Sequence, residues 1–195
     1  MRLTTISHYY WTMNKQWLVM VLLISSSVFA ANVDDRIDIA SRTADAALKR
    51  LKSAMLEQMS NEGTPEKAIP FCHVSAQPMT AEEISGRVVD VRRATLKTRN
   101  SKNLASKTEA GILRRWSTLQ EKGEKIPEYE TAVEKNLLHY YRPLKIEAMC
   151  LACHGAEATL SPGVVKILKE KYPNDKATGY QEGDLRGMIH VVVKK

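Results

Sequence analysis

The 195-residue sequence contains few cysteines, no internal repeat and no low-complexity segment. The lack of repeats excludes a repeat architecture. The sequence also has no block of basic residues with interleaved aromatics, so we expect no nucleic-acid partner. Three cysteines cannot all pair within the chain, which leaves at least one thiol for another role. With 44% hydrophobic and 26% charged residues, the composition is ordinary, and the chain is long enough for one domain with a hydrophobic core.

Only one long hydrophobic run is present, and it lies within residues 1–30. Lys15 precedes the apolar residues 17–29, and the small-residue pattern ending at Ala30 is typical of a cleavage site. The run is short and serine-rich at its end, which argues against a membrane span. We therefore predict a signal peptide over residues 1–30 and a single periplasmic domain over residues 31–195. An uncleaved N-terminal anchor is the alternative. Because no second run of this kind follows, we expect no stable membrane span in the mature form and no attached cytoplasmic output module.

Positive charge exceeds negative charge, and the formal net charge is +7. Loss of the signal peptide would remove the two positive charges of Arg2 and Lys15 and leave about +5. The basic residues are scattered and alternate with acids along the predicted helices, which is typical of solvated surfaces. The excess can assist contact with an acidic redox partner or an anionic surface.

A C-x-x-C-H run at residues 150–154 carries the clearest chemical signal. Thiols at this spacing, from Cys150 and Cys153, can add to the two vinyl groups of a haem. His154 directly follows them and can ligate the iron through a ring nitrogen. Gly155 then lets the backbone turn away without a Cβ clash. Together with the predicted export signal, this run predicts one covalently attached c-type haem.

Two other interpretations of the cysteines stay open. A redox dithiol uses the same C-x-x-C spacing, but it is expected at a helix N-terminus within a βαβ unit, whereas strand and loop are predicted before Cys150. A structural zinc site needs four ligands, and the C-x-x-C-H run supplies at most three. Cys72 or His73 would have to supply the fourth. In the haem interpretation Cys72 is left over as an inert buried thiol, an intermolecular disulfide partner or a metal ligand.

Hydrophobic periodicity predicts a long amphipathic helix over residues 32–59. Met55 and Met59 belong to its apolar stripe, and we assign them no chemistry. A short helix around the first cysteine is expected next. It should be disturbed at Pro70 and should end at Pro78, because proline lacks the amide hydrogen that a helix interior needs.

Four strands are predicted in the rest of the chain, the first of them from its alternating residues. They are expected at residues 86–95, 129–133, 137–146 and 188–192. A capping box formed by Ser106 and Glu109 opens a helix that Gly123 closes, with Trp116 as its core anchor. A last helix is predicted to begin at Pro162.

Four segments, taken together, resemble a known family. They are residues 68–72 (A-I-x-x-C), residues 93–100 (similar to R-T-S-L-K-x-R-N), the C-x-x-C-H run with its glycine, and residues 172–187 (similar to Y-P-x-D-x-A-x-G-Y…G-D-x-R-G). On these residues the chain is similar to the single-haem periplasmic or lumenal domains of PAS-like fold, found alone and as extracytoplasmic sensor domains of histidine kinases and chemoreceptors. The resemblance implies an α+β fold, with a PAS-like central antiparallel sheet flanked by helices and a long N-terminal helix.

The resemblance also implies an unusual pair of iron ligands. Family members are described with the histidine of the C-x-x-C-H run and a cysteine thiolate as axial ligands, which here are His154 and Cys72. An anionic thiolate stabilises ferric iron, so we expect a low potential and a bond that weakens on reduction. The competing distal ligands, by residue type, are His73, Met79, His139 and His190.

The basic segment before the Ser106 helix offers donors for the anionic propionates of a haem. The candidates are Arg93, Lys97, Arg99 and Asn100. For each of them a solvated surface loop is the alternative. For Asp184 and Arg186 we expect a structural turn pair rather than a contact with the cofactor.

Three classes of function fit these features. The chain can be an electron carrier, a redox or small-ligand sensor, or a haem enzyme with peroxidase or nitrogen-oxide chemistry. An enzyme needs acid-base groups beside an open iron position, and no such constellation is visible, so we expect no enzymatic activity. We rank an exported, low-potential haem redox protein first, with an unidentified redox or signalling partner.

Overall fold

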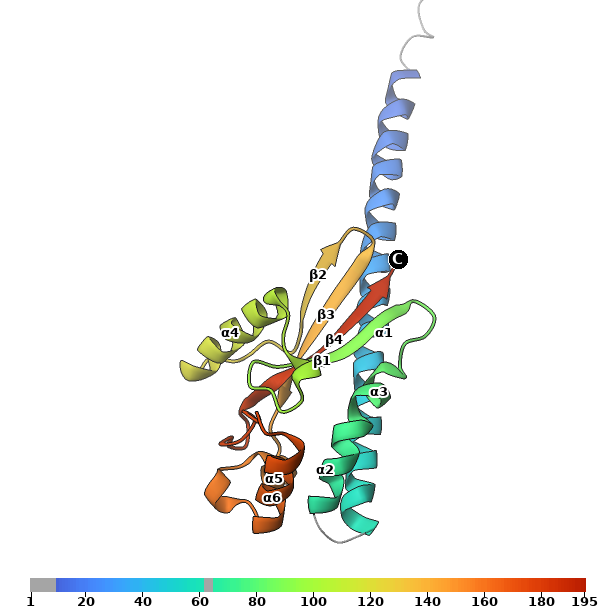
Figure 1. Cartoon of the computed structure of the whole chain (residues 1–195). Coiled ribbons are helices and arrows are strands. Elements are labelled where there is room, and N and C mark those ends of the chain that lie inside the picture. Colours follow the sequence, from blue (N-terminus) through green and yellow to red (C-terminus); the bar gives the residue numbers. More distant parts are fainter. Residues whose placement is uncertain (1–9, 62–64) are drawn as a thin grey trace, which may run out of the picture.

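The computed structural model describes the backbone of residues 10–61 and 65–195, and the side chains of residues 35–60 and 65–195. A four-stranded antiparallel sheet lies at its centre, with helices on both faces (Figure 1). The strands are β1 (Val88–Ala94), β2 (Glu130–Glu134), β3 (Leu137–Lys145) and β4 (Leu185–Lys194). The main helices are α1 (Tyr10–Asn61), α2 (Pro65–Val74), α3 (Ala76–Ala81), α4 (Lys107–Glu121), α5 (Leu151–His154) and α6 (Pro162–Lys171). Three short 3-10 turns, η1 (Ser101–Asn103), η2 (Ala148–Cys150) and η3 (Glu157–Thr159), complete the elements.

The last strand in the sequence, β4, occupies the middle of the sheet. The strand order is β1-β4-β3-β2, and each pair is antiparallel. Val191 lies at the centre of β4, opposite Val91 of β1 and Tyr140 of β3. Because successive side chains of a strand point to opposite faces, β4 contributes to two separate hydrophobic cores.

One core joins the sheet to α1. Ala40, Ala44 and Ala47 recur at helical spacing and are fully buried against the sheet. Ile189 and Val191 of β4 lie in the same cluster. The small alanine side chains let the long helix approach the strands closely, so α1 serves as a backing for the sheet.

The other core joins the opposite face of the sheet to α4. Trp116 and Leu113 of α4 are buried with Tyr141 and Met188 of the sheet. Trp116 is therefore the core anchor that the sequence predicts. The predicted capping box is also present, because the Ser106 side chain accepts from the Glu109 amide while the Glu109 side chain accepts from the Ser106 amide.

The α+β prediction, with a central antiparallel sheet flanked by helices, is confirmed. The four predicted strands lie where expected, although β4 extends beyond both of its predicted ends. The predicted helix break was wrong in position. Pro70 lies inside α2, and the helix is interrupted at Ser75 instead of Pro78. Pro78 occupies the first turn of α3, where an amide hydrogen has no intrahelical partner to lose.

The first helix extends further towards the N-terminus than the sequence predicts. The helix α1 begins at Tyr10 and not at residue 32. The signal-peptide prediction for residues 1–30 falls on positions whose side chains lie outside the described residues, so it stays a prediction. Within the described part of the chain, no helix is both long and apolar enough to cross a membrane.

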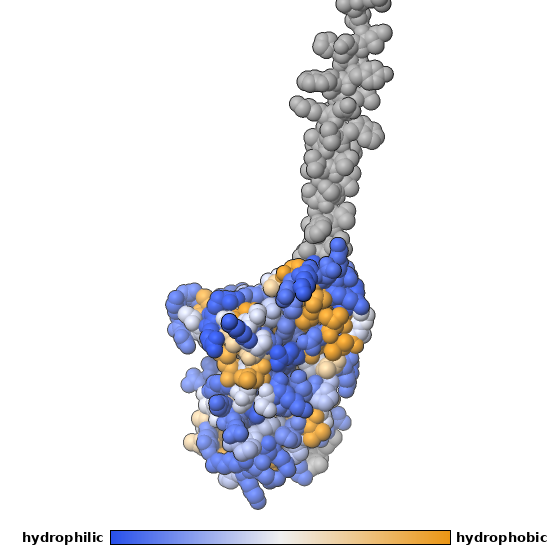
Figure 2. Space-filling view, turned by 45° about the horizontal axis from the view of Figure 1, so that its top comes forward, coloured by the Kyte–Doolittle hydropathy of each residue, from blue (hydrophilic) through white to orange (hydrophobic). Residues whose placement is uncertain are grey.

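The surface agrees with the scattered charge pattern of the sequence. On the face shown in Figure 2, hydrophilic residues cover most of the surface and hydrophobic residues form separate patches. The most exposed large hydrophobic side chains, Val74, Leu104 and Val133, come from three different parts of the chain. The helices α2, α5 and α6 lie together beyond one end of the sheet (Figure 1), and the candidate site is found there.

Candidate functional site

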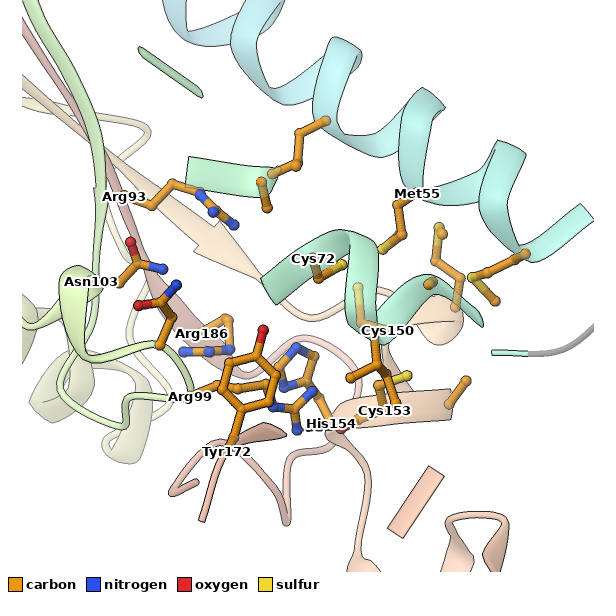
Figure 3. Close-up of a pocket in the computed structure, with 18 residues that line it drawn as sticks. Met55, Cys72, Arg93, Arg99, Asn103, Cys150, Cys153, His154, Tyr172 and Arg186 are labelled. Atoms are coloured by element: carbon orange, nitrogen blue, oxygen red, sulfur yellow. Dashed lines mark hydrogen bonds between the residues drawn. The ribbon is translucent and has the colours of Figure 1, made fainter. Parts of the chain in front are cut away.

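A cavity of about 180 Å³ brings together residues from widely separated parts of the chain. Its lining is mostly apolar, with a cluster of sulfur atoms and a cluster of arginines (Figure 3). The lining residues are Leu51, Met55, Met59, Ala68, Ile69, Cys72, Ala76, Arg93, Arg99, Asn100, Asn103, Met149, Cys150, Ala152, Cys153, His154, Tyr172 and Arg186. The C-x-x-C-H run and Cys72, which the sequence separates widely, therefore share one cavity.

The C-x-x-C-H run forms two consecutive short helical turns, η2 and α5. This local structure places Cys150 and Cys153 one turn apart, on the side that lines the cavity. Gly155 ends the run, and a Cβ at this position would lie 2.7 Å from the Leu151 carbonyl oxygen. Glycine is needed here because of this contact, as the sequence predicts. The φ of Gly155 is −64°, which any residue can adopt, so the backbone angle does not require glycine.

The His154 ring is held in one orientation. Its Nδ1 donates to the Ala177 carbonyl oxygen at 2.6 Å, because a carbonyl can only accept. Burial, followed by the charges of Arg99 and Arg186, lowers the pKa of His154 to about 3. The ring is neutral, and the hydrogen on Nδ1 leaves the lone pair of Nε2 available as a metal ligand.

All three cysteines are free and half-buried. Burial raises the pKa of Cys153 to about 11, with Arg99 acting in the opposite direction. Burial also raises the pKa of Cys72, while Arg93 and Arg99 lower it. The cavity therefore presents neutral thiols from two different segments, beside cations that favour the thiolate form of Cys72.

Arginine side chains from three elements line the cavity (Figure 3). Arg93 lies on β1, Arg99 in the loop after β1, and Arg186 on β4. Burial lowers the pKa of Arg93; Cys72 acts in the opposite direction, and Arg186 lowers this pKa further. The Arg93 Nε–H is buried without a hydrogen-bond partner among the described residues, as is the Oδ1 of Asn103. A buried unpaired donor such as the Arg93 Nε–H needs an explanation, and a binding site for an anionic group supplies one.

The four donors predicted from the basic segment have different surroundings. Arg93 reaches the cavity with free hydrogen-bonding capacity. Asn100 also lines the cavity, but its side chain accepts from the Lys102 amide and caps η1. Lys97 does not line the cavity; its Nζ donates to the Thr178 carbonyl oxygen at 3.1 Å.

Arg99, the fourth predicted donor, lines the cavity and uses its guanidinium within the protein. Its Nε donates to Asp175 Oδ2 at 2.9 Å, and its Nη2 donates to the Cys153 carbonyl oxygen at 2.6 Å. The side chain thus ties the C-x-x-C-H run to the closing segment of the chain.

Cys72 is the only one of the proposed distal ligands that lines the cavity, among the residues that the structure describes. His73 is on the same helix but packs edge-on against the Tyr172 ring. His139 and His190 lie on the sheet, with Nδ1 of one 3.0 Å from Nε2 of the other. Met79 is in α3 and does not contribute to the lining.

Sequence reasoning missed several residues of the lining. Met55 and Met59 were assigned only to a packing stripe, yet they form part of the cavity wall. Arg186 was expected to pair with Asp184, but its Nη1 donates to Thr95 Oγ1 at 2.9 Å. Asp184 accepts instead from the Gln181 amide. The signal for Arg186 was its place in the segment 172–187, which the resemblance had already marked.

The lining fits the haem that the C-x-x-C-H run predicts. An apolar wall with methionines suits a flat hydrophobic macrocycle, and the unpaired Nε–H of Arg93 suits its anionic edge. Two thiols at the attachment spacing lie beside an imidazole with a free nitrogen. A zinc site would need at least three such ligands close together, and among the described side chains no group of three or more His, Cys, Asp or Glu is placed to hold a metal ion.

The sheet and its two helical layers define an α+β protein. Its cavity brings together two thiols, an imidazole and a third thiol that is far away in the sequence. A family model described as Tll0287-like matches residues 26–194, and the chain belongs to this family. The solved structure of the cyanobacterial heme-protein Tll0287 is 28% identical, with a TM-score of 0.53, over 76% of this chain and 91% of that chain. A search of curated proteins found no match. The match confirms the resemblance to a haem-protein family that the sequence predicts.

Proposed function

We propose that this chain is an exported redox protein that carries one haem, attached covalently through Cys150 and Cys153. The observation that supports it is the shared cavity, in which the C-x-x-C-H run faces Cys72 and the arginines. Membership of the Tll0287-like family, with a related protein described as a heme-protein, supports the same cofactor. Export follows from the predicted signal peptide and from the extracytoplasmic attachment of c-type haems.

His154 and Cys72 are the residues that would ligate the haem iron. The Ala177 carbonyl holds the His154 ring with its Nε2 free, as in histidines that bind metals through that nitrogen. Cys72, the proposed sulfur ligand, lines the same cavity from α2. Arg93 and Arg186 would receive the propionates, because both line the cavity and Arg93 keeps an unpaired donor.

The chemistry that the haem supplies is one-electron transfer. The protein would tune it through the ligands, and an anionic thiolate from Cys72 would favour ferric iron and a low potential. The cavity lining contains no carboxylate among the described residues, and its one imidazole is the proposed ligand His154. We therefore propose electron transfer or redox sensing with a separate partner, without enzymatic turnover.

The test is the Cys72→Ser variant, purified after expression with a periplasmic haem-attachment system. Intact mass should show one haem in both proteins and the loss of residues 1–30. The ferric absorption and EPR spectra of the variant should change, because the thiolate ligand is lost. The matched control is His73→Gln, next in the sequence but outside the cavity lining, which should keep the wild-type spectra. Unchanged low-spin spectra in Cys72→Ser would refute the cysteine ligand, and absence of covalent haem from the wild type would refute the proposed function.

The same purified protein separates a carrier from a sensor. A sensor needs a ligand that can leave, and the bond to Cys72 is expected to weaken on reduction. Carbon monoxide that binds the reduced wild-type protein therefore favours sensing of redox state or small ligands. A reduced protein that stays inert to carbon monoxide favours an electron carrier.

A further inference from the structure

Arg99 and Asp175 form an ion pair beside His154, although neither residue is adjacent to it in the sequence. The Arg99 Nε lies 2.9 Å from Asp175 Oδ2, and both side chains are only 11% exposed. Isolated surface ion pairs contribute little, but a buried pair holds its two partners in a defined geometry. This pair therefore fixes how the loop after β1 meets the closing segment of the chain.

Both members of the pair also contact Ala177, the residue that accepts the hydrogen bond from His154. Asp175 Oδ1 accepts from the Ala177 amide at 2.8 Å. Arg99 Nη2 donates to the Ala177 carbonyl oxygen at 3.3 Å and to the Cys153 carbonyl oxygen at 2.6 Å. The Ala177 carbonyl thus receives two donors, and one of them is His154 Nδ1 at 2.6 Å.

Backbone hydrogen bonds also join the segment after Ala177 to His154 and Gly155. The amide of Gly179 donates to the Gly155 carbonyl at 2.8 Å, and the amide of Tyr180 donates to the His154 carbonyl at 3.0 Å. Ala177 itself is completely buried. No solvent competes at this carbonyl, so its direction depends on the side chains that hold it.

We propose that Arg99 and Asp175 are a positioning pair that sets the orientation and donor strength of His154 through the Ala177 carbonyl. The inference rests on the proposed function, in which His154 ligates the haem iron. A hydrogen bond from Nδ1 increases the electron donation of the opposite nitrogen and tunes a metal that it binds. The pair also balances charge, because the carboxylate of Asp175 neutralises the cation of Arg99 next to this ligand.

Replacing the Asp175 carboxylate by an amide alters both the charge balance and the electron donation by His154. Both changes should shift the reduction potential in the same direction. The uncompensated Arg99 cation would disfavour the more positive ferric state. A looser Ala177 carbonyl would weaken electron donation from His154, which also disfavours the ferric state. The reduction potential should therefore rise in Asp175→Asn.

The experiment compares haem-loaded wild type with Asp175→Asn and with Asp184→Asn. The control Asp184 lies in the same segment and caps its own turn by accepting from the Gln181 amide, without a hydrogen bond to Ala177. A tenfold change in relative stability of the two oxidation states corresponds to about 59 mV for one electron. We expect a rise of this order and altered ferric EPR g-values in Asp175→Asn, and wild-type values in Asp184→Asn.

A second variant protects the test against loss of folding. Arg99→Lys keeps the positive charge and loses the fork that donates to both carbonyl oxygens, so we expect a smaller rise in potential. Wild-type potential and EPR spectra in both haem-loaded variants would overturn the inference, and so would an equal shift in Asp184→Asn. Mass spectrometry of the wild type is read first. If no haem is attached there, the proposed function has failed, and that outcome is distinct from a potential that does not move.

Discussion

Glu109 is a buried carboxylate that accepts hydrogen bonds from a residue nearby in the sequence and from residues far from it. It accepts from the Ser106 amide at 2.7 Å and caps α4, as the sequence predicts. It also accepts from Arg92 Nη1 at 2.8 Å and from His190 Nδ1 at 2.9 Å. Burial alone would raise its pKa, but the bonds from His190 and Ser106 and the charge of Arg92 lower it to about 2. The carboxylate thus fastens α4 to β1 and β4.

This depressed pKa makes the stability of the fold dependent on acid. A carboxyl group with a lower pKa in the folded state stabilises the fold above its unfolded pKa, and this stabilisation is lost as the pH falls. For Glu109 the loss should occur between about pH 4.5 and about pH 2, and it should amount to about 3 kcal/mol. Urea denaturation of the wild type and of Glu109→Gln across this range measures it.

We expect Glu109→Gln to be less stable than wild type at pH 7 and to lack this part of the pH dependence. The matched control is Glu128→Gln, since the Glu128 side chain is 84% exposed and its ion-pair partner within the described part of the chain is the equally exposed Lys125. That control should follow the wild-type curve. Parallel curves for wild type and Glu109→Gln would contradict the prediction.

The same residue shows what the sequence could predict and what it could not. The capping box needs only Ser106 and Glu109, which are three residues apart, so its pattern is local. The bond to His190 joins residues 81 apart. It depends on the strand order, and the strand order follows from packing rather than from any local pattern. Cys150, Cys153 and His154 were predictable for the same reason as the cap, whereas Arg186 became part of the site only through the position of β4.

At the scale of elements, two glycines differ in the space around the position that a Cβ would occupy. Gly187 lies on β4, where a Cβ would be too close to the Ala94 carbonyl oxygen of β1. Gly111 lies inside α4, and a Cβ there would meet nothing within 4 Å. Gly187 is therefore needed for the close contact between β4 and β1. Gly111 has no such role and only reduces the stability of α4.

Substitution by alanine should have opposite effects on the free energy of unfolding at these two glycines. Gly111→Ala should raise the free energy of unfolding by about 1 kcal/mol, since alanine is the better helix former. Gly187→Ala should lower it by about 2 kcal/mol or more, because the backbone of β1 must move. Thermal and urea denaturation of both variants measure the difference. Destabilisation by Gly111→Ala, or a neutral Gly187→Ala, would contradict it.

Strands were easier to predict than helix ends in this chain. Alternating residues located β1, whereas β4 is buried on both faces and was located as a short apolar run. The break between α2 and α3 could not be predicted in the same way. Proline was expected to stop the helix at Pro78, but Pro70 is accommodated inside α2 and the interruption falls at Ser75. The α2 helix contacts α1 and α6, and a local sequence pattern does not contain these contacts.

At the scale of the whole molecule, the cores fall into two regions. Two clusters lie on the faces of the sheet and contain residues of α1, α4 and the strands. Two smaller clusters lie around the cavity; one joins Ile69 of α2 to Val164 and Leu168 of α6, and the other contains Ile146, Ala177 and Tyr180. The smaller clusters surround a cavity rather than a continuous core, so we expect them to depend on the bound group.

This arrangement predicts a regional response to loss of the cofactor. In a Cys150→Ala, Cys153→Ala variant without attached haem, amide hydrogen exchange should increase in α2, α5 and α6. Exchange in β1, β3 and β4 should remain close to that of the haem-loaded wild type, because the sheet clusters do not line the cavity. Hydrogen exchange followed by mass spectrometry resolves these segments. Equal acceleration in the sheet and in α2 would show that the haem stabilises the molecule as one cooperative unit, and no acceleration in α2 would show that this wall of the cavity is stable without it.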